Sequence, residues 1–367
     1  MNTMKTFTTT TLGWAMLAFA IPACQKDAGD AKTADAKKID TKKLDAKADV
    51  DKDKGKDKDA AAKPVDNATL VTNGMKAFNE RNYDAALANF TDDSEWVLVG
   101  GPDPAEPLNG KAAIKAQWER DVAAFDVKLF PTRIFDAGNL VVAQTVFQGN
   151  HKGEYGSMKP TNKDVGVEGL YLAWVDNGKI KKSEWYANIA GVMAQTGAIP
   201  GPAPAIPAAP TSAPETVKGA GDENNIATTK EIYAAFSKAD WSVLDKHFVA
   251  DAKHVSAADG KTSTGAAEMK KGLQEWAKAV PDWKLDAIET FVVGPYVLVR
   301  STSTGTHKGK FGPIKATNKP VNLHEAQVIE FADGKVKTVY LYENHAEFLA
   351  QIGQLPGPNT ADAVAQK

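Results

Sequence analysis

Two glutamates in the C-terminal half of the chain have the type and the spacing to move protons. Glu325 lies in a predicted strand, Val321–Phe331, on the same face as Gln327, because side chains two residues apart point to one side of a strand. Glu343 shares a face with Leu341 in the next predicted strand. Two carboxylates in an apolar pocket push their pKa values apart, which makes one an acid and the other a base. The alternative is a position at the rim, solvated or paired with Lys or Arg.

The remaining reactive residue types give no recognisable catalytic or metal-binding motif. His151 and His307 each stand in a Gly-x-His-x-Gly segment, where a base or ligand role competes with a role in a turn. The other histidines show no metal-ligand spacing with Asp or Glu, and the chain has one cysteine. Phosphate-binding loops, dinucleotide-binding glycine motifs, Gly-x-Ser-x-Gly and His-Glu-x-x-His do not occur. We therefore expect neither a cofactor nor a metal.

Both glutamate-bearing strands belong to a stretch that occurs twice. Residues 151–202 and 307–358 align without a gap at a spacing of 307 − 151 = 156 residues. His-Lys-Gly, Thr-Asn-Lys, Tyr-x-Asn and Gln-x-Gly-x-x-Pro-Gly-Pro recur in step. A period of this length exceeds any solenoid unit, so it indicates two whole domains of one fold.

The N-terminus has the pattern of a bacterial lipoprotein signal. An apolar run of about ten residues ends in Ile21-Pro22-Ala23-Cys24, too short for the ~20 residues that span a bilayer. The small residue before Cys24 resembles a lipobox, so we expect Cys24 to be acylated. The alternative is a plain secretory signal. Gln25 and Lys26 lack the aspartate of inner-membrane retention, which favours the outer membrane, at its periplasmic or surface face.

Composition divides the rest of the chain into folded domains and linkers. Lys, Asp and Ala dominate the segment after Cys24, which predicts a disordered tether, and prolines from Pro200 to Pro214 predict an extended spacer. The expected parts are a signal peptide 1–24, a tether 25–66, domain 1 at 67–199, a linker 200–222, domain 2 at 223–355 and a disordered tail 356–367. A formal net charge of −2 argues against a nucleic-acid partner.

Each domain is predicted to have helices first and strands afterwards. In domain 2, Met269, Leu273, Trp276 and Val280 recur at i, i+4, i+7 and i+11, which indicates one apolar helical face. An earlier helix is expected with Thr228 or Thr229 at its cap. The strands follow, with Asp-Gly-Lys and Asn-Gly-Lys hairpins in the two domains. This order predicts an α+β fold, with helices packed on a curved antiparallel sheet.

The repeated Gly-x-His-x-Gly, Thr-Asn-Lys turn, Asp-Gly-Lys hairpin and Gln-x-Gly-x-x-Pro resemble the SnoaL-like polyketide cyclases and ester cyclases. That family belongs to the NTF2-like superfamily of α+β cones, which includes ketosteroid isomerase. By this resemblance, the cyclase base falls at Leu341 and Trp185, and the pocket histidine at Gln327 and Tyr171. None of these side chains can take those roles. The resemblance also places a pocket polar group at His254.

Aromatic side chains predict an apolar interior that is either hollow or filled. In domain 1 they are Trp96, Trp118, Tyr171 and Trp185, and in domain 2 Trp276 lies on the helical face described above. With Gln327, Leu341, His254 and His307, these residues are the predicted ligand-binding set.

We expect a membrane-anchored protein that binds a small apolar ligand or a protein partner without turnover. The alternatives are a cyclase- or isomerase-like enzyme working through Glu325 and Glu343 in domain 2 only, and a structural role. In the structural role the two repeats, or two chains as a homodimer, pack on each other. A deep pocket that contains both glutamates favours the enzyme, a deep pocket without them favours binding, and a filled cone favours the structural role.

Overall fold

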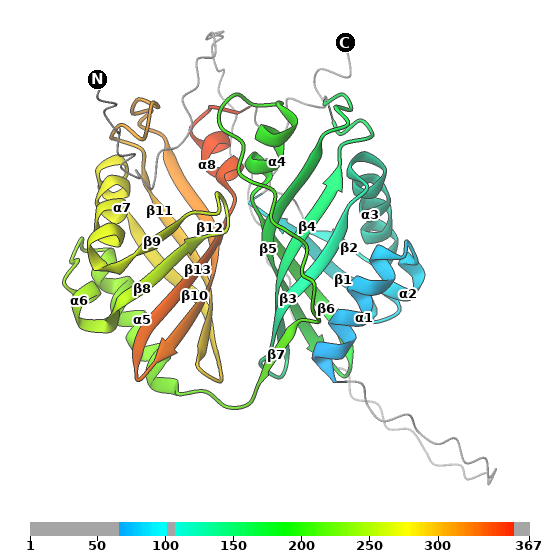
Figure 1. Ribbon diagram of the computed structural model, residues 1–367, viewed down its shortest axis with the longest axis horizontal. Coiled ribbons are helices and arrows are strands. Elements are labelled where there is room, and N and C mark those ends of the chain that lie inside the picture. The colour runs from blue at the N-terminus through cyan, green and yellow to red at the C-terminus, as the bar shows by residue number, and fades with distance from the viewer. Residues whose placement is uncertain (1–65, 101–106, 157, 356–367) are drawn as a thin grey trace, which may run out of the picture. The chain divides into compact units, whose positions relative to one another are not determined.

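The computed structural model describes residues 66–100, 107–156 and 158–355, which form two α+β domains in succession (Figure 1). The predicted lipidation site Cys24, the tether up to residue 65 and the tail 356–367 lie outside the described residues. Among the helices of the described ranges, none has the length and apolarity to cross a membrane.

Domain 1 begins with helices and continues into a mixed sheet. Its helices are α1 Asn67–Asn79, α2 Tyr83–Leu87, α3 Lys111–Phe125 and α4 Ile189–Thr196. Its strands are β1 Phe90–Val99, β2 Leu108–Asn109, β3 Lys128–Asp136, β4 Leu140–Asn150, β5 Asp164–Asp176, β6 Lys179–Ala187 and β7 Glu215–Lys218. The sheet order is β2-β1-β6-β5-β4-β3-β7. The helical part of the domain covers one face of this sheet (Figure 1).

Domain 2 repeats this arrangement. Its helices are α5 Glu223–Phe236, α6 Val243–His247, α7 Gly265–Ala279 and α8 His345–Gln351. Its strands are β8 Phe248–Ser256, β9 Thr262–Thr264, β10 Lys284–Val293, β11 Tyr296–Thr306, β12 Pro320–Ala332 and β13 Lys335–Glu343, in the order β10-β11-β12-β13-β8-β9. The predicted fold of helices on a curved sheet is confirmed. Within each mostly antiparallel sheet, the first long strand pairs parallel with the last long strand, β1 with β6 and β8 with β13.

Local sequence explains where the elements turn and end. Asn177-Gly178 and Asp333-Gly334 both have positive φ, which the predicted tight hairpins β5–β6 and β12–β13 require. Helix α5, however, begins before Thr229, because the Asp222 carboxylate accepts from Asn224 N and caps it. Thr229 instead lies inside the helix, where its hydroxyl donates to Asn225 O.

The predicted proline-rich linker contributes to the domain 1 sheet. Within it, Glu215–Lys218 forms β7, which pairs parallel with β3, with Arg133 opposite Glu215. The Gln148 side chain donates to Pro207 O at 2.6 Å, and the Gln195 side chain donates to Pro204 O at 3.1 Å. Part of the segment predicted as an extended spacer is therefore held against domain 1.

The Gly-x-His-x-Gly motif is a packing motif in both repeats. A Cβ atom on Gly153 would lie 2.5 Å from Ala123 O, and one on Gly309 would collide with Lys278 O. Only glycine allows the loop to approach the end of α3 or α7 this closely. The approach lets the backbone N–H groups of Lys152 and Lys308 donate to Ala124 O and Ala279 O. These two bonds also fix the structural alignment of α3 with α7.

The Tyr-x-Asn motif lies where residues of the two repeats make contact. Asn188 Oδ1 accepts from His345 N, and Asn344 Oδ1 accepts from Ile189 N, both at 3.1 Å. These asparagines are equivalent, 156 residues apart, so each caps the first turn of the other repeat's helix. The motif tyrosines, Tyr186 and Tyr342, belong to one buried apolar cluster with residues from both sheets.

Candidate functional site: two cavities with different carboxylates

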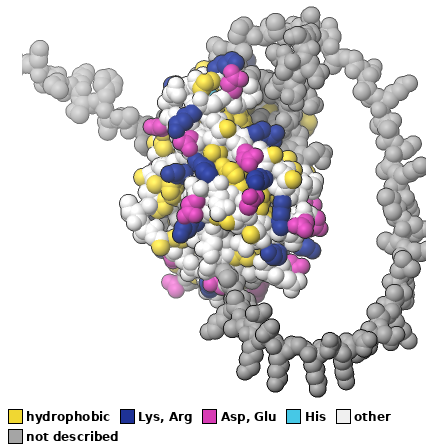
Figure 2. Space-filling model, turned by 90° about the vertical axis from the view of Figure 1, so that its right-hand side faces the viewer, with side chains coloured by type: hydrophobic (Ala, Val, Ile, Leu, Met, Phe, Trp, Pro, Cys, Tyr) yellow, Lys and Arg dark blue, Asp and Glu magenta, His cyan; other side chains and the backbone are white. Residues whose placement is uncertain are grey.

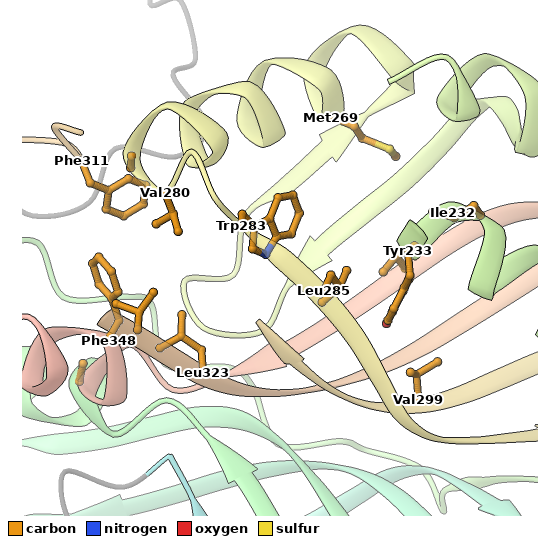
Figure 3. Packing of buried hydrophobic residues seen from close by; sticks show 14 of the residues in the cluster. Ile232, Tyr233, Met269, Val280, Trp283, Leu285, Val299, Phe311, Leu323 and Phe348 are labelled. Carbon is orange, nitrogen blue, oxygen red and sulfur yellow. The ribbon is translucent and has the colours of Figure 1, made fainter. Parts of the chain in front are cut away.

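A cavity of about 120 Å³ lies between the helices and the sheet of domain 2. This volume is on the order of ten times the space that one water molecule needs. Its walls come from α5, α7, the strands and α8, and they are mainly apolar. Figure 3 shows Tyr233, Trp283 and Leu323 from this region among the packed side chains.

Both predicted glutamates line this cavity. Glu325 on β12 lies directly opposite Glu343 on β13 in the strand register. Directly opposed like charges destabilise a sheet, and this pair faces an apolar interior. The stretch Leu323–Phe331 places Glu325 and Gln327 on the inner face, as its alternation predicts.

Glu325 is the more deeply buried carboxyl, with 7% of its surface exposed. Burial, with a further contribution from the charge of Glu343, raises the pKa of Glu325 to about 8. Hydrogen bonds from Ser303 and Gln327 oppose this shift of the pKa. Ser303 is itself fixed, because its hydroxyl accepts from the Trp283 indole at 2.6 Å. Glu325 therefore holds a proton at neutral pH and can donate it.

Glu343 lies nearer to solvent and has an imidazole partner. Its Oε1 lies 3.1 Å from His345 Nε2, and both side chains are less than one fifth exposed. His254 on β8 lines the same wall, opposite Val339 of β13. Burial lowers the pKa of His254, and the charges of Glu343 and Asp259 partly offset this effect. Its imidazole is therefore neutral at pH 7.

Most of the predicted ligand-binding residues of domain 2 meet at this cavity. His254, Trp276, Gln327 and Leu341 all line it. His307 is not among the lining residues that the structure describes. Its fully buried ring packs edge-on against Phe348, and its Nδ1 lies 3.0 Å from Thr317 Oγ1. His307 thus organises the loop, and a ligand role for it gains no support.

Domain 1 has a cavity of the same size, about 120 Å³. All four predicted aromatic residues line it, namely Trp96, Trp118, Tyr171 and Trp185. In the strand register, Trp96 lies opposite Ser183 just as His254 lies opposite Val339, so Trp96 takes the place of His254.

The glutamate pair has no counterpart in domain 1. The positions of Glu325 and Glu343 are Gly169 and Ala187, which face each other in the β5–β6 register. A Cβ atom on Gly169 would lie 2.6 Å from the Trp185 indole nitrogen and 3.0 Å from Tyr186 O. The tryptophan therefore occupies the space that a side chain at 169 would need.

Domain 1 has instead a carboxylate that sequence reasoning missed, Asp121 on α3. It lines the cavity and accepts from Gln117 Nε2 at 2.8 Å. Burial raises the pKa of Asp121 to about 6. The sequence spacing could have placed Asp121 on the inner face of α3, because Ile114, Trp118, Asp121 and Phe125 have the i, i+4, i+7, i+11 spacing of the α7 face. In the alignment of Ala124 with Ala279, Asp121 takes the place of Trp276.

Metal-ligand groupings and surface charge give no further candidate site among the described residues. Within the described ranges, no group of three or more His, Cys, Asp or Glu side chains is arranged to hold a metal ion. Figure 2 shows acidic and basic side chains interspersed over one face of the molecule.

The chain belongs to the SnoaL-like polyketide cyclase family, whose profile matches residues 69–196 and 227–352, one copy in each domain. Similar solved structures include AclR from Streptomyces galilaeus (30% identity, 36% of this chain, 98% of that chain, TM-score 0.34). TsrD from Streptomyces laurentii (20%, 36%, 98%, 0.34) and IdmH from Streptomyces antibioticus (19%, 36%, 99%, 0.33) are also similar. Each corresponds in length to one repeat. Comparison with curated proteins gave no match.

Proposed function

We propose that domain 2 is a catalytic site that transfers protons to and from a small apolar carbonyl compound, as a cyclase or isomerase does. The observation that carries this proposal is the Glu325–Glu343 pair, which lies inside an apolar cavity in place of the hydrophobic side chains that would stabilise the fold better. Paired carboxyls with separated pKa values are the arrangement that acid–base catalysis needs.

The two glutamates take different roles because their surroundings differ. Glu325 keeps its proton and donates a hydrogen bond to the carbonyl oxygen, where negative charge develops. Glu343 accepts the proton from the adjacent carbon, and His345 beside it connects the carboxylate to solvent. The family's usual base position, Leu341, lines the cavity as an apolar wall. The chemistry thus moves to neighbouring positions on the same two strands.

Domain 1 has no such pair, which supports a ligand-binding role without turnover for its cavity. Nearly all of its lining is apolar, and ligand pockets are mostly apolar with a few polar groups. The chain would then combine one binding domain with one catalytic domain.

The test of the catalytic proposal is deuterium exchange at the α-carbon of apolar cyclic ketones, followed by NMR in D₂O with the full chain. Exchange catalysed by the wild type should fall on the order of 100-fold or more in Glu325→Gln and in Glu343→Gln. Glu330→Gln is the matched control, because Glu330 lies on the same strand and pairs with Lys337 on the outer face. Ketones that bind without any exchange would instead establish binding without turnover.

We further propose that the protein is exported and anchored through an acylated Cys24 to the outer membrane, at its periplasmic or surface face. The lipobox-like segment and the Lys/Asp/Ala tether support this proposal. Stable anchoring requires more than one acyl chain. Cys24→Ser should therefore move the protein from the membrane fraction to the soluble fraction, and an unchanged distribution would contradict the proposal.

We also propose that the two repeats pair with each other as an internal dimer. The reciprocal Asn188 and Asn344 caps support it, since an isologous interface uses the same residues on both sides. So do Gln144 and Arg300, equivalent residues that reach Tyr342 and Tyr186 of the opposite repeat. A homodimer of two chains remains the competing arrangement, distinguished by the mass of the protein in solution.

A further inference from the structure

The cavity of domain 1 surrounds one carboxylate with aromatic rings. Nine of its 23 lining residues are Phe, Tyr or Trp, and Asp121 is the one lining side chain, among those described, that carries a charge at neutral pH. On α3, Trp118 precedes Asp121 by one turn and Phe125 follows it by one turn, so these residues share a face of the helix.

Asp121 has little in its described surroundings to balance a negative charge. The Gln117 amide donates to its Oδ1, and the exposed Arg120 guanidinium donates to Gln117 Oε1, so Arg120 makes no direct ion pair with Asp121, although its charge lowers the pKa of Asp121 slightly. The tyrosines that line the cavity are Tyr155 and Tyr171, and burial raises the pKa of Tyr171 to about 12. Tyr171 therefore stays neutral near pH 7. The Asp121 carboxylate is only partly exposed, and a partly desolvated carboxylate gains from a cation that pairs with it directly.

Aromatic rings present a negative face to a cation. Trp118 packs edge-on against Phe78 and Phe90, with ring centroids 5.4 and 5.9 Å apart. Phe125 holds Tyr155 at 5.1 Å. These contacts fix the rings around the cavity, so a cation that enters does not have to order them. A neutral carbonyl ligand would gain less, because its oxygen would face the lone pairs of the carboxylate.

We propose that the cavity of domain 1 binds a small organic ammonium ion, which pairs with Asp121 and contacts the surrounding aromatic rings. This proposal rests on the proposed ligand-binding role of domain 1 and adds the chemical class of the ligand. The site is specific to domain 1, since Trp276 occupies the position of Asp121 in domain 2.

The test compares two probes of the same shape on the full chain, choline and its neutral isostere 3,3-dimethylbutan-1-ol. Binding is measured by calorimetry and by the NMR shift of the Trp118 indole. At pH 7.5 choline should bind roughly 10-fold or more tightly than the alcohol, given the worth of a desolvated cation–π contact and a charged pair. Its affinity should fall toward pH 5, because Asp121 is protonated below its pKa of about 6.

Three variants make the result specific. Asp121→Asn should remove the preference for choline and leave the affinity for the alcohol, whereas Asp121→Glu should retain the preference. Glu119→Gln, an exposed change on the same helix, removes one negative charge and should change neither affinity. Equal binding of the two probes, or choline binding that survives in Asp121→Asn, would overturn the ammonium proposal alone. If neither probe moves the Trp118 signal, the ligand-binding role of domain 1 fails with it.

Discussion

The two domains have the same fold, and their cavities have the same volume. The carboxylates, however, lie on the helical wall in domain 1 and on the sheet wall in domain 2. Domain 1 has Asp121 on the helix and Gly169 and Ala187 on the sheet. Domain 2 has Trp276 on the helix and Glu325 and Glu343 on the sheet. In each domain a tryptophan, Trp185 or Trp276, lies on the wall where the other domain has a carboxyl side chain. Duplication of one cone has thus produced two cavities with different chemistry, while the loops and hairpins stayed alike.

This difference shows which parts of the repeat serve the fold. The motifs shared by both copies do structural work, such as the glycines against α3 and α7 and the asparagines that cap the opposite repeat. The residues that give each cavity its charge differ between the copies. A search for function among the shared motifs alone would have missed all three carboxyls.

The largest expected effect is the pH dependence of the free energy of unfolding, which differs between the carboxyls of the two domains. The native state holds the Glu325 proton up to about pH 8, whereas an unfolded glutamate releases it near 4.5. The free energy of unfolding should therefore fall as pH rises through this window, by up to about 1.4 kcal/mol per pH unit. Urea unfolding should show this slope between about pH 6 and pH 8 in the wild type but not in Glu325→Gln.

The corresponding slope from Asp121 should end near pH 6, because burial raises its pKa only that far. Asp121→Asn should remove that smaller contribution. If the free energy of unfolding depends on pH identically in the wild type and in Glu325→Gln, the cavity of domain 2 is solvated and the pKa of Glu325 is not raised.

The next effect tests the equivalent residues Arg300 and Gln144 at the contact between the repeats. Arg300 Nη2 lies 2.7 Å from Glu184 Oε1, and the Glu184 side chain is only 5% exposed. Arg300→Gln gives domain 2 the residue of domain 1 and should lower the free energy of unfolding by about 2–3 kcal/mol, since it removes a charged hydrogen bond and leaves the buried Glu184 with Lys182 as its only ion-pair partner within the described residues, at 2.8 Å. Arg133→Gln, whose partner Glu215 is exposed, is the control and should cost about 1 kcal/mol or less. A similar loss of unfolding free energy in both variants would argue against a buried Arg300–Glu184 ion pair between the repeats.

The smallest expected effect is a change in stability at Gly169, where the Trp185 indole leaves no room for a side chain. Gly169→Ala should destabilise the protein by about 1–3 kcal/mol, because the new methyl group collides with the Trp185 indole. Gly74→Ala on α1 should stabilise it by about 0.5–1 kcal/mol, since the nearest atom is 3.9 Å away and alanine favours a helix. Thermal unfolding measures both, and a neutral Gly169→Ala would show that this wall yields easily.

The sequence predicted the fold well because its signals are periodic and doubled. The alternation in β12 placed Glu325 beside Gln327 on the inner face, and the α7 stripe located a helix that packs on the sheet. Asp121 was missed because an aspartate interrupts the apolar stripe of α3, and Val122 beside it gives a competing pattern. The role of the proline-rich linker depends on distant contacts, such as that between Arg133 and Glu215, which composition does not encode.

The most direct test of the central claim is a pH titration of the glutamate carboxyl carbons by NMR on the full chain, with signals assigned through Glu325→Gln and Glu343→Gln. Glu325 should titrate near pH 8, move when a cyclic ketone is added, and titrate lower in Glu343→Gln, because the charge of Glu343 contributes to its raised pKa. A Glu325 that titrates near the ordinary value of about 4.3 and ignores every ketone would contradict a catalytic pair in domain 2. The chain would then hold two binding cavities.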